Sequence, residues 1–169
     1  MKTLILGGAR SGKSGLAQRR AQATGLPVTF IATAEAWDDE MAVRIARHQA
    51  DRPSGWRCIE EPLALAAVLQ AECAEDRCVI VDCLTLWLTN LLLDSETRLE
   101  AETAALLQVI PSLPGEVLIV SNETGMGVVP ADVLSRRFVD ATGWLHQSLA
   151  TQCDAVLLTV AGLPVQLKG

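Results

Sequence analysis

Gly7-Gly8-Ala9-Arg10-Ser11-Gly12-Lys13-Ser14 fits G-x-x-x-x-G-K-S/T, the pattern of the P-loop. An apolar run at 1–6 precedes it and a helix-like run at 15–21 follows, so a short buried strand leads through a glycine turn into a helix. Backbone N–H groups of such a loop point inward at a helix N-terminus and cradle phosphate oxygens. Lys13 is expected to reach the β- and γ-phosphates of a nucleotide, and the Ser14 hydroxyl to bind Mg²⁺. The alternative, a plain glycine turn, is disfavoured by the spacing and the flanking runs.

Strand-like and helix-like segments alternate along the rest of the chain. Strands are expected at 2–6, 28–32, 56–59, 78–81, 116–120 and 155–160. Helices are expected at 13–24, 38–51, 62–75, 84–110 (broken near Asp94-Ser95) and 131–152. Several of the strands are continuous apolar runs, which are typical of strands covered on both faces.

This alternation predicts an α/β fold: a P-loop NTPase-type, mostly parallel sheet with helices on both faces. After the last strand, Gly162-Leu163-Pro164 turns into 165–168, which predicts a short antiparallel edge at the C-terminus. Such sheets bind ligands beyond the carboxyl ends of their strands, where the P-loop would lie.

Length and composition exclude several classes of protein. The 169 residues suit a single domain, 1–169, with a substantial core. The longest dense apolar stretch, 83–93, is too short to span a bilayer, and the first residues show no signal-peptide pattern, so a cytoplasmic protein is expected. A net charge of −6 without a basic stripe argues against nucleic acid as the main partner. The five cysteines include no C-x-x-C pair and are expected to be reduced and mostly buried.

A carboxylate ends one of the apolar strands. The run 79–81 leads directly to Asp82, which is the Walker-B pattern and predicts a residue that holds Mg²⁺ opposite Ser14, directly or through water. The alternative is that Asp82 caps the helix beginning near Leu84. Asn90, within that helix, is interpreted as structural.

A histidine among arginines lies in the run 37–53. At helical spacing Arg44, His48 and Arg52 line up, with Asp51 beside them. Neighbouring cations disfavour imidazolium and would keep a ring nitrogen of His48 free to attack, while the arginines could grip phosphates. From spacing alone, a solvated basic helix end is the favoured interpretation. His146, on an apolar-flanked helix, is interpreted as a packing or surface residue.

The loop 121–130 follows the strand 116–120 at its carboxyl end, on the expected ligand side. Asn122 and Glu123 could touch nucleotide, metal or acceptor, and a connecting loop with turn residues is an equal alternative. No N-K-x-D motif for guanine occurs here, so a Ras-type GTPase is disfavoured.

Together these motifs resemble a known family over essentially the whole chain. The matching segments, in order, are Gly7 to Ser14, Ile31-Ala32-Thr33-Ala34, Asp38-Asp39-Glu40-Met41, Arg44-Ile45-x-x-His48, Arg52-Pro53, Trp56-Arg57-x-x-Glu60, Val81-Asp82-Cys83-Leu84-Thr85 with Thr89-Asn90, and Ser121-Asn122-Glu123-x-Gly125-Met126-Gly127-Val128-Val129-Pro130. The chain resembles the bifunctional adenosylcobinamide kinase / adenosylcobinamide-phosphate guanylyltransferase family of cobalamin biosynthesis.

The resemblance implies two reactions. A nucleoside triphosphate, ATP or GTP, phosphorylates the aminopropanol hydroxyl of adenosylcobinamide. GTP then guanylylates the enzyme, and GMP passes to adenosylcobinamide phosphate, giving adenosylcobinamide-GDP. The family's covalent carrier matches His48, and a homotrimer with sites between subunits is implied. The matching nucleotide-binding positions are Gly7, Gly8, Ala9, Arg10, Ser11, Gly12, Lys13, Ser14, Ala32, Thr33, Ala34, Gln49, Ala50, Asp51, Arg52, Glu60 and Asp82.

Two positions depart from part of the family. Arg47 stands where some relatives carry His, and Asp82 where some carry the longer Glu, which leaves the direct or water-mediated role of Asp82 open. The general base of the kinase step also stays open between Glu123 and Asp82. Two other functions are kept beside this one: a monofunctional P-loop kinase of a small molecule, and a nucleotide-dependent switch or binding protein.

Overall fold

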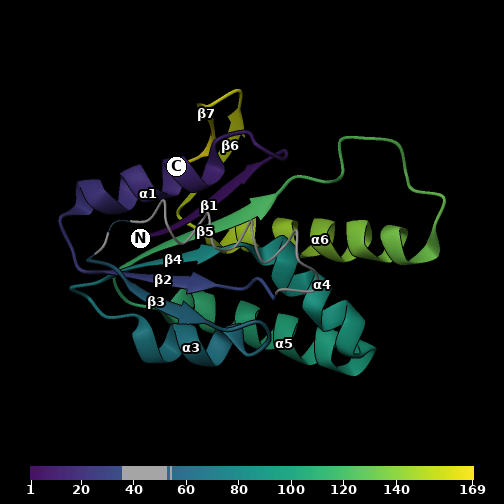
Figure 1. Cartoon of the computed structure of the whole chain (residues 1–169), viewed down its shortest axis with the longest axis horizontal. Helices are drawn as coiled ribbons and strands as arrows, with labels where there is room; N and C mark the ends of the chain where they lie inside the picture. Colours follow the sequence, from purple (N-terminus) through teal and green to yellow (C-terminus); the bar gives the residue numbers. More distant parts are fainter. Residues whose placement is uncertain (36–52, 54) are drawn as a thin grey trace.

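A single sheet organises the part of the chain that the structure, a computed structural model, describes: residues 1–35, 53 and 55–169. Within these residues the sheet has seven strands in the order β3-β2-β4-β5-β1-β6-β7 (Figure 1). All neighbours pair in parallel except β6 and β7, which are antiparallel. The strands are β1 (Lys2–Gly7), β2 (Val28–Ala32), β3 (Arg57–Glu60), β4 (Cys78–Asp82), β5 (Glu116–Asn122), β6 (Ala155–Val160) and β7 (Leu163–Lys168). The predicted fold class, with its antiparallel C-terminal edge, is confirmed.

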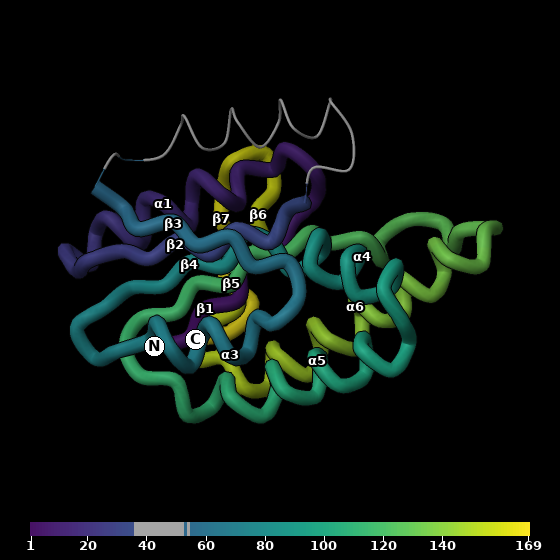
Figure 2. Tube along the Cα trace, turned by 60° about the horizontal axis from the view of Figure 1, so that its bottom comes forward, coloured from purple at the N-terminus to yellow at the C-terminus, as the bar shows by residue number. Residues whose placement is uncertain are grey.

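Helices cover both faces of this sheet. Among the described helices, α1 packs on one face, and α3 to α6 pack on the other (Figures 1 and 2). The helices are α1 (Lys13–Thr24), α3 (Leu65–Glu72), α4 (Leu84–Asp94), α5 (Glu96–Val109), the 3₁₀ helix η1 (Ile110–Ser112) and α6 (Val133–Gln152). None of these described helices is long and apolar enough to cross a membrane.

The core consists of two apolar layers because side chains alternate across each strand. In β1, Leu4 and Leu6 face the layer shared with α3 to α6, while Ile5 faces the layer shared with α1. Trp87 of α4 is fully buried and its indole N–H donates to the carbonyl oxygen of Leu63 at 2.7 Å. Burial on both faces explains why the central strands are continuous apolar runs.

Several predicted boundaries differ from the observed ones by a few residues. The helix expected over 62–75 spans only Leu65–Glu72, because Glu61 accepts hydrogen bonds from the backbone of Leu63 and Ala64 and holds them in a turn. The predicted break near Asp94-Ser95 is confirmed, since Ser95 is extended and its hydroxyl accepts from the backbone N–H of Arg98 at the start of α5. The helix expected over 38–51 lies outside the described residues.

The carboxyl ends of the six parallel strands lie along one edge of the sheet. Gly7 of β1 lies beside Asn122 of β5, and Ala32 of β2 lies between Asp82 of β4 and Glu60 of β3. Four of the predicted site positions therefore share this edge with the start of the 121–130 loop.

Candidate functional site

The P-loop joins β1 to α1 in a conformation that depends on its glycines. Gly7 and Gly12 have φ angles of 154° and 98°, in a region that side chains rarely adopt. A Cβ at Gly7 would also lie 2.5 Å from the carbonyl oxygen of Thr159 in β6. Gly12 is the N-cap of α1 and supplies no side-chain acceptor to the first N–H groups of the helix. These N–H groups are suited to bind an anion.

Lys13 is folded into this loop. It is buried, and its ammonium donates to the carbonyl oxygen of Gly8 at 2.7 Å. Burial lowers the pKa of Lys13, and the nearby charges of Asp82 and Cys83 oppose that shift. A buried ammonium in this loop is suited to bind phosphate oxygens.

Asp82 is not the N-cap of the helix that follows it. The N-cap residue of α4 is Cys83 rather than Asp82, so the capping alternative is wrong. Asp82 and Ser14 offer a carboxylate and a hydroxyl, the oxygen donors that Mg²⁺ prefers. Within the described residues there is no group of three or more His, Cys, Asp or Glu side chains that could hold a metal ion. Mg²⁺ bound to a nucleotide typically has only one or two protein ligands, and phosphate oxygens and water supply the rest. The two residues Ser14 and Asp82 therefore fit this ion.

The segment after β2 lies beside Asp82. Thr33 is fully buried, and its backbone N–H donates to the carbonyl oxygen of Asp82 at 3.4 Å. Ala34 is half-buried and Glu60 is exposed. Ala32, Thr33, Ala34 and Glu60 therefore form one border of the site.

The loop after β5 begins next to the P-loop. The backbone N–H of Glu123 donates to the carbonyl oxygen of Gly7 at 2.9 Å, and the Asn122 amide donates to the Thr85 hydroxyl at 3.0 Å. Beyond Glu123 the segment up to α6 extends away from the sheet (Figure 1). The start of the 121–130 loop thus borders the site, whereas Met126 and Val128 are exposed outside it.

Two polar residues have the structural roles that the sequence predicted. His146 of α6 is buried, with its Nε2 2.7 Å from the hydroxyl oxygen of Ser121. Burial lowers the pKa of His146, and the charge of Glu123 opposes this shift. Asn90 is buried and donates to the carbonyl oxygens of Thr33 and Pro62.

Sequence reasoning missed two contacts of the site. The backbone N–H of Gly162, in the β6–β7 turn, donates to the carbonyl oxygen of Ser11, so the C-terminal hairpin supports the P-loop. Thr33, Cys83 and Thr85 form a buried polar cluster behind Asp82. The only sequence signal for it is the position of Cys83 and Thr85 directly after the Walker-B acid.

The predicted nucleophile lies outside the described residues. The same is true of His48's neighbours Gln49, Ala50, Asp51 and Arg52, and of Arg44 and Arg47. Their roles rest on the sequence.

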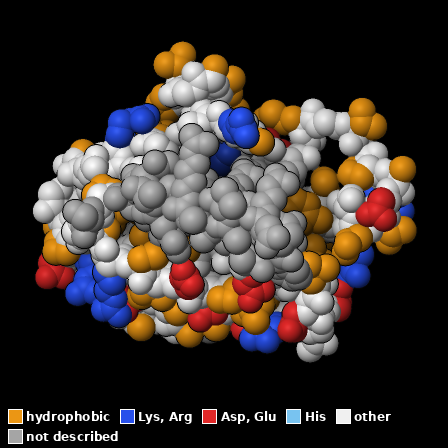
Figure 3. Space-filling model, in the orientation of Figure 1, with side chains coloured by type: hydrophobic (Ala, Val, Ile, Leu, Met, Phe, Trp, Pro, Cys, Tyr) orange, Lys and Arg blue, Asp and Glu red, His pale blue; other side chains and the backbone are white. Residues whose placement is uncertain are grey.

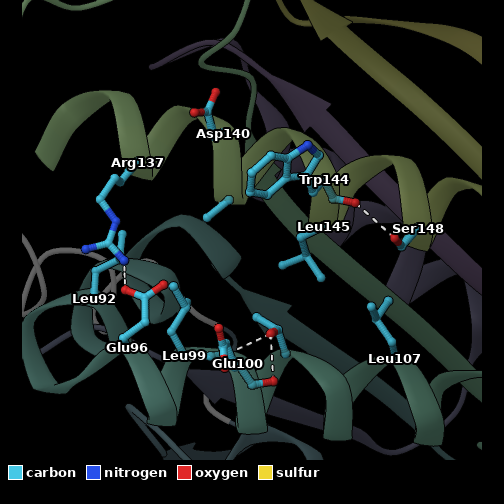
Figure 4. Close-up of a pocket in the computed structure, with 12 residues that line it drawn as sticks. Leu92, Glu96, Leu99, Glu100, Leu107, Arg137, Asp140, Trp144, Leu145 and Ser148 are labelled. Carbon is cyan, nitrogen blue, oxygen red and sulfur yellow. Dashed lines mark hydrogen bonds and ion pairs between the residues drawn. The ribbon is translucent and has the colours of Figure 1, made fainter. Parts of the chain in front are cut away.

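A hollow of about 400 Å³ lies between α5 and α6. Figure 4 shows the ion pair of Arg137 with Glu96 at one end of it and the Trp144 ring at its rim. None of the predicted site residues lines it, so it is separate from the P-loop site.

Comparisons with known proteins agree with this geometry. A sequence model of the family described as cobinamide kinase / cobinamide phosphate guanyltransferase matches residues 3–167. The chain is 61% identical to the bifunctional adenosylcobalamin biosynthesis protein CobP of Pseudomonas aeruginosa, covering 100% of this chain and 98% of that protein. It is 37% identical to the bifunctional adenosylcobalamin biosynthesis protein CobU of Escherichia coli, covering 99% of this chain and 100% of that protein.

Some solved structures resemble this chain in fold, at low sequence identity. A Pyrococcus horikoshii protein superposes with a TM-score of 0.59 at 9% identity, covering 99% of this chain and 86% of that one. The RadB recombinase superposes with a TM-score of 0.50 at 15% identity, covering 93% of this chain and 73% of that one. Both have folds of the P-loop NTPase type.

Proposed function

Because the chain belongs to the cobinamide kinase / cobinamide phosphate guanyltransferase family, we propose that it catalyses two consecutive transfers to a cobinamide. In the first, ATP or GTP phosphorylates the aminopropanol hydroxyl of adenosylcobinamide. In the second, GMP from GTP passes through His48 to adenosylcobinamide phosphate and yields adenosylcobinamide-GDP. The observation that carries this proposal is the P-loop between β1 and α1, with the buried Lys13 in it and Asp82 at the carboxyl end of β4 on the same edge of the sheet.

In the kinase step the P-loop binds and orients the donor. Backbone N–H groups at residues 7–14 hold the phosphates, and the Lys13 ammonium stabilises the negative charge that develops on the transferred phosphoryl group. Ser14 and Asp82 would hold Mg²⁺, which neutralises phosphate charge when bound. The donor's P–O bond breaks as the acceptor hydroxyl attacks and loses its proton.

In the guanylyl step a ring nitrogen of His48 attacks the α-phosphate of GTP. The P–O bond to pyrophosphate breaks and a P–N bond forms. A phosphate oxygen of adenosylcobinamide phosphate then attacks the same phosphorus, the P–N bond breaks, and free His48 is restored. This step draws on the sequence motif and the family relationship.

The other proposed nucleotide contacts surround these residues. They are Ala32, Thr33, Ala34, Gln49, Ala50, Asp51, Arg52 and Glu60. The position of the carboxyl ends of β2, β3 and β4 side by side supports the contacts at 32–34 and at Glu60.

We also propose a cytoplasmic homotrimer built from a single domain over 1–169. Exposed apolar side chains support association: they gather on the β6–β7 hairpin and on the segment 126–134 (Figure 3). Val128 is 96% exposed and Leu163 is 70% exposed. Apolar surface of this kind is typical of protein interfaces.

We predict that GTP labelled at its α-phosphate, supplied with Mg²⁺ and no acceptor, labels the protein covalently. The bond should be acid-labile and alkali-stable, as a P–N bond is. The chain has two histidines, His48 and His146, and three lysines, Lys2, Lys13 and Lys168, whose amines could form a similar bond, so the variants identify the carrier. Label should vanish in His48→Ala and persist in His146→Gln. Unlabelled active protein would leave a monofunctional kinase, and label retained in His48→Ala would overturn the role of His48 as the carrier. Absence of any acceptor-dependent transfer would favour the switch.

For the kinase step, we expect Lys13→Ala to lower kcat by roughly 10²-fold or more, because a preorganised positive charge on the developing transition state is lost. Transfer of γ-labelled phosphate to adenosylcobinamide measures this. Lys13→Arg is the matched control, since it keeps the charge but replaces a compact ammonium by a planar guanidinium. Undiminished transfer in Lys13→Ala would overturn the role assigned to the P-loop.

A further inference from the structure

The Thr33 side chain is bonded to the backbone that follows Asp82. Its hydroxyl donates to the carbonyl oxygen of Cys83 at 2.7 Å and accepts from the backbone N–H of Cys83 at 2.9 Å. Its own backbone N–H donates to the carbonyl oxygen of Asp82 at 3.4 Å. One threonine therefore contacts three backbone groups of the two residues at the end of β4.

These bonds occupy the polar groups of Thr33. A hydroxyl has one donor and two lone pairs, and Cys83 takes the donor and one lone pair. The carbonyl oxygen of Thr33 accepts from the Asn90 amide at 2.8 Å. Because Thr33 is 0% exposed, its hydroxyl lies behind the protein surface and is occupied by the bonds to Cys83.

Thr33 is itself held in place, so it can act as a fixed point. Asn90 belongs to α4 and also donates to the carbonyl oxygen of Pro62 at 3.1 Å, which ties the segment after β2 to the helix after β4. Because Thr33 is itself held by Asn90, its hydroxyl stays in place and can position the backbone of Cys83.

Cys83 is held from the opposite side as well. Its sulfur lies 3.0 Å from the Thr85 hydroxyl, and that hydroxyl accepts from the Asn122 amide at 3.0 Å. The residue after Asp82 is thus fixed from β2 through Thr33 and from β5 through Thr85. The backbone next to Asp82 is therefore held on two sides.

We propose that Thr33 is a positioning residue for Asp82: its hydroxyl fixes the backbone at Cys83 and so directs the carboxylate toward Lys13 and the P-loop. This inference rests on the proposed role of Asp82 as a ligand of nucleotide-bound Mg²⁺. Misplacing a catalytic group by about 1 Å costs on the order of 10²-fold in rate, so the clamp matters to the reaction although Thr33 takes no part in the chemistry.

The test is the substitution Thr33→Val, which keeps the branched shape of the side chain and removes the hydroxyl. Thr3→Val is the matched control: Thr3 of β1 is equally buried, and its hydroxyl has no hydrogen-bond partner among the described residues. Three quantities are measured in each variant: kcat of the kinase step, affinity for Mn²⁺ in the nucleotide complex by electron paramagnetic resonance, and affinity for nucleotide without metal.

For Thr33→Val we expect kcat to fall by roughly 10- to 100-fold and Mn²⁺ binding to weaken by about 10-fold, while metal-free nucleotide affinity stays within about 3-fold. Thr33→Ser, which keeps the hydroxyl, should restore most of both losses. Thr3→Val should change none of the three quantities. If Thr33→Val does not fold, Thr33→Ala serves instead, since it removes the hydroxyl and adds no bulk, and the same losses are expected.

Two outcomes would overturn the proposal: wild-type kcat and Mn²⁺ affinity in Thr33→Val, or a loss that Thr33→Ser does not restore. The variant Asp82→Asn distinguishes failure of the role proposed for Thr33 from failure of the metal role proposed for Asp82. If Asp82→Asn weakens Mn²⁺ binding and Thr33→Val does not, Thr33 has no positioning role and the metal assignment stands. If Asp82→Asn binds Mn²⁺ as the wild type does, the metal assignment itself fails.

Discussion

At the scale of single residues, the buried His146 shows how the protein accommodates a titratable group away from its reaction. Its ring lies against the hydroxyl of Ser121, one residue before Asn122 at the edge of the site. Since burial disfavours the imidazolium, the neutral ring is the form that the fold accepts. The pairing links α6 to the end of β5, and protonation would disturb it.

We predict that His146 makes the protein less stable in mild acid. Its folded-state pKa lies below the ordinary value of 6.5, so as pH falls through 6.5 the unfolded chain binds a proton that the folded protein does not. The free energy of unfolding should therefore fall with pH until the folded-state pKa is passed. Urea unfolding at pH 7.5 and 5.5 measures this. His146→Gln should show the shallower decline because it lacks this titration and retains only the contribution of the other titrating groups. Parallel declines in the two proteins would contradict the assignment.

At the scale of elements, the P-loop is shaped by the strands on either side of β1. Gly7 approaches Thr159 of β6 so closely that no side chain fits, and the β6–β7 turn donates to Ser11. The loop is thus held by the C-terminal hairpin as well as by its own turn residues. Gly8, next in the chain, has open space where a Cβ would lie, with no neighbouring atom within 4 Å.

Gly7→Ala and Gly8→Ala should therefore differ sharply in stability. At Gly7 the added methyl would meet the Thr159 carbonyl oxygen at 2.5 Å and the Ser11 hydroxyl at 2.6 Å, at a φ of +154°. We expect this change to destabilise the protein by roughly 1–3 kcal/mol. Thermal unfolding without nucleotide measures both variants, with Gly8→Ala expected near the wild type. Equal unfolding temperatures would show that the loop can move away from β6.

At the scale of the whole molecule, the strand order places the predicted site residues along one edge of the sheet. β1 lies between β5 and β6, and β4 lies between β2 and β5, so the P-loop, Asp82 and Asn122 reach the same edge. Meanwhile the hairpin and the segment 126–134 present apolar side chains outward (Figure 3). A surface of this kind is costly in water unless another molecule covers it.

We expect sedimentation of the wild-type protein to give a mass three times that of the 18.1 kDa chain. Val128→Asp places a charge on the most exposed of these side chains and should shift the protein toward smaller species. Gln22→Glu, which adds the same charge at an exposed polar position on α1, should leave the mass unchanged. A monomeric wild type would contradict the trimer, and a trimeric Val128→Asp would exclude this segment from the interface.

Much of the fold was predictable because its signals are local. The apolar runs 28–32 and 155–160 coincide with β2 and β6, and the break at Ser95 lies where a capping serine follows an aspartate. The helix expected over 62–75 was too long because the turn bonds made by Glu61 override helix propensity. The position of the P-loop between β1 and α1, and of Asp82 at the end of β4, was predictable because each motif carries its own strand context.

The amino-acid sequence by itself determined the α/β class, the P-loop and the Walker-B acid, because glycine spacing and continuous apolar runs act over a few neighbouring residues. Only the tertiary structure decided that Thr33 is bonded to the backbone of Cys83, 50 positions away in the chain. Only it decided, too, that the C-terminal hairpin supports the P-loop through Gly162 and Ser11. Contacts of this kind depend on which strands become neighbours, and strand order results from packing of the whole core rather than from any local pattern.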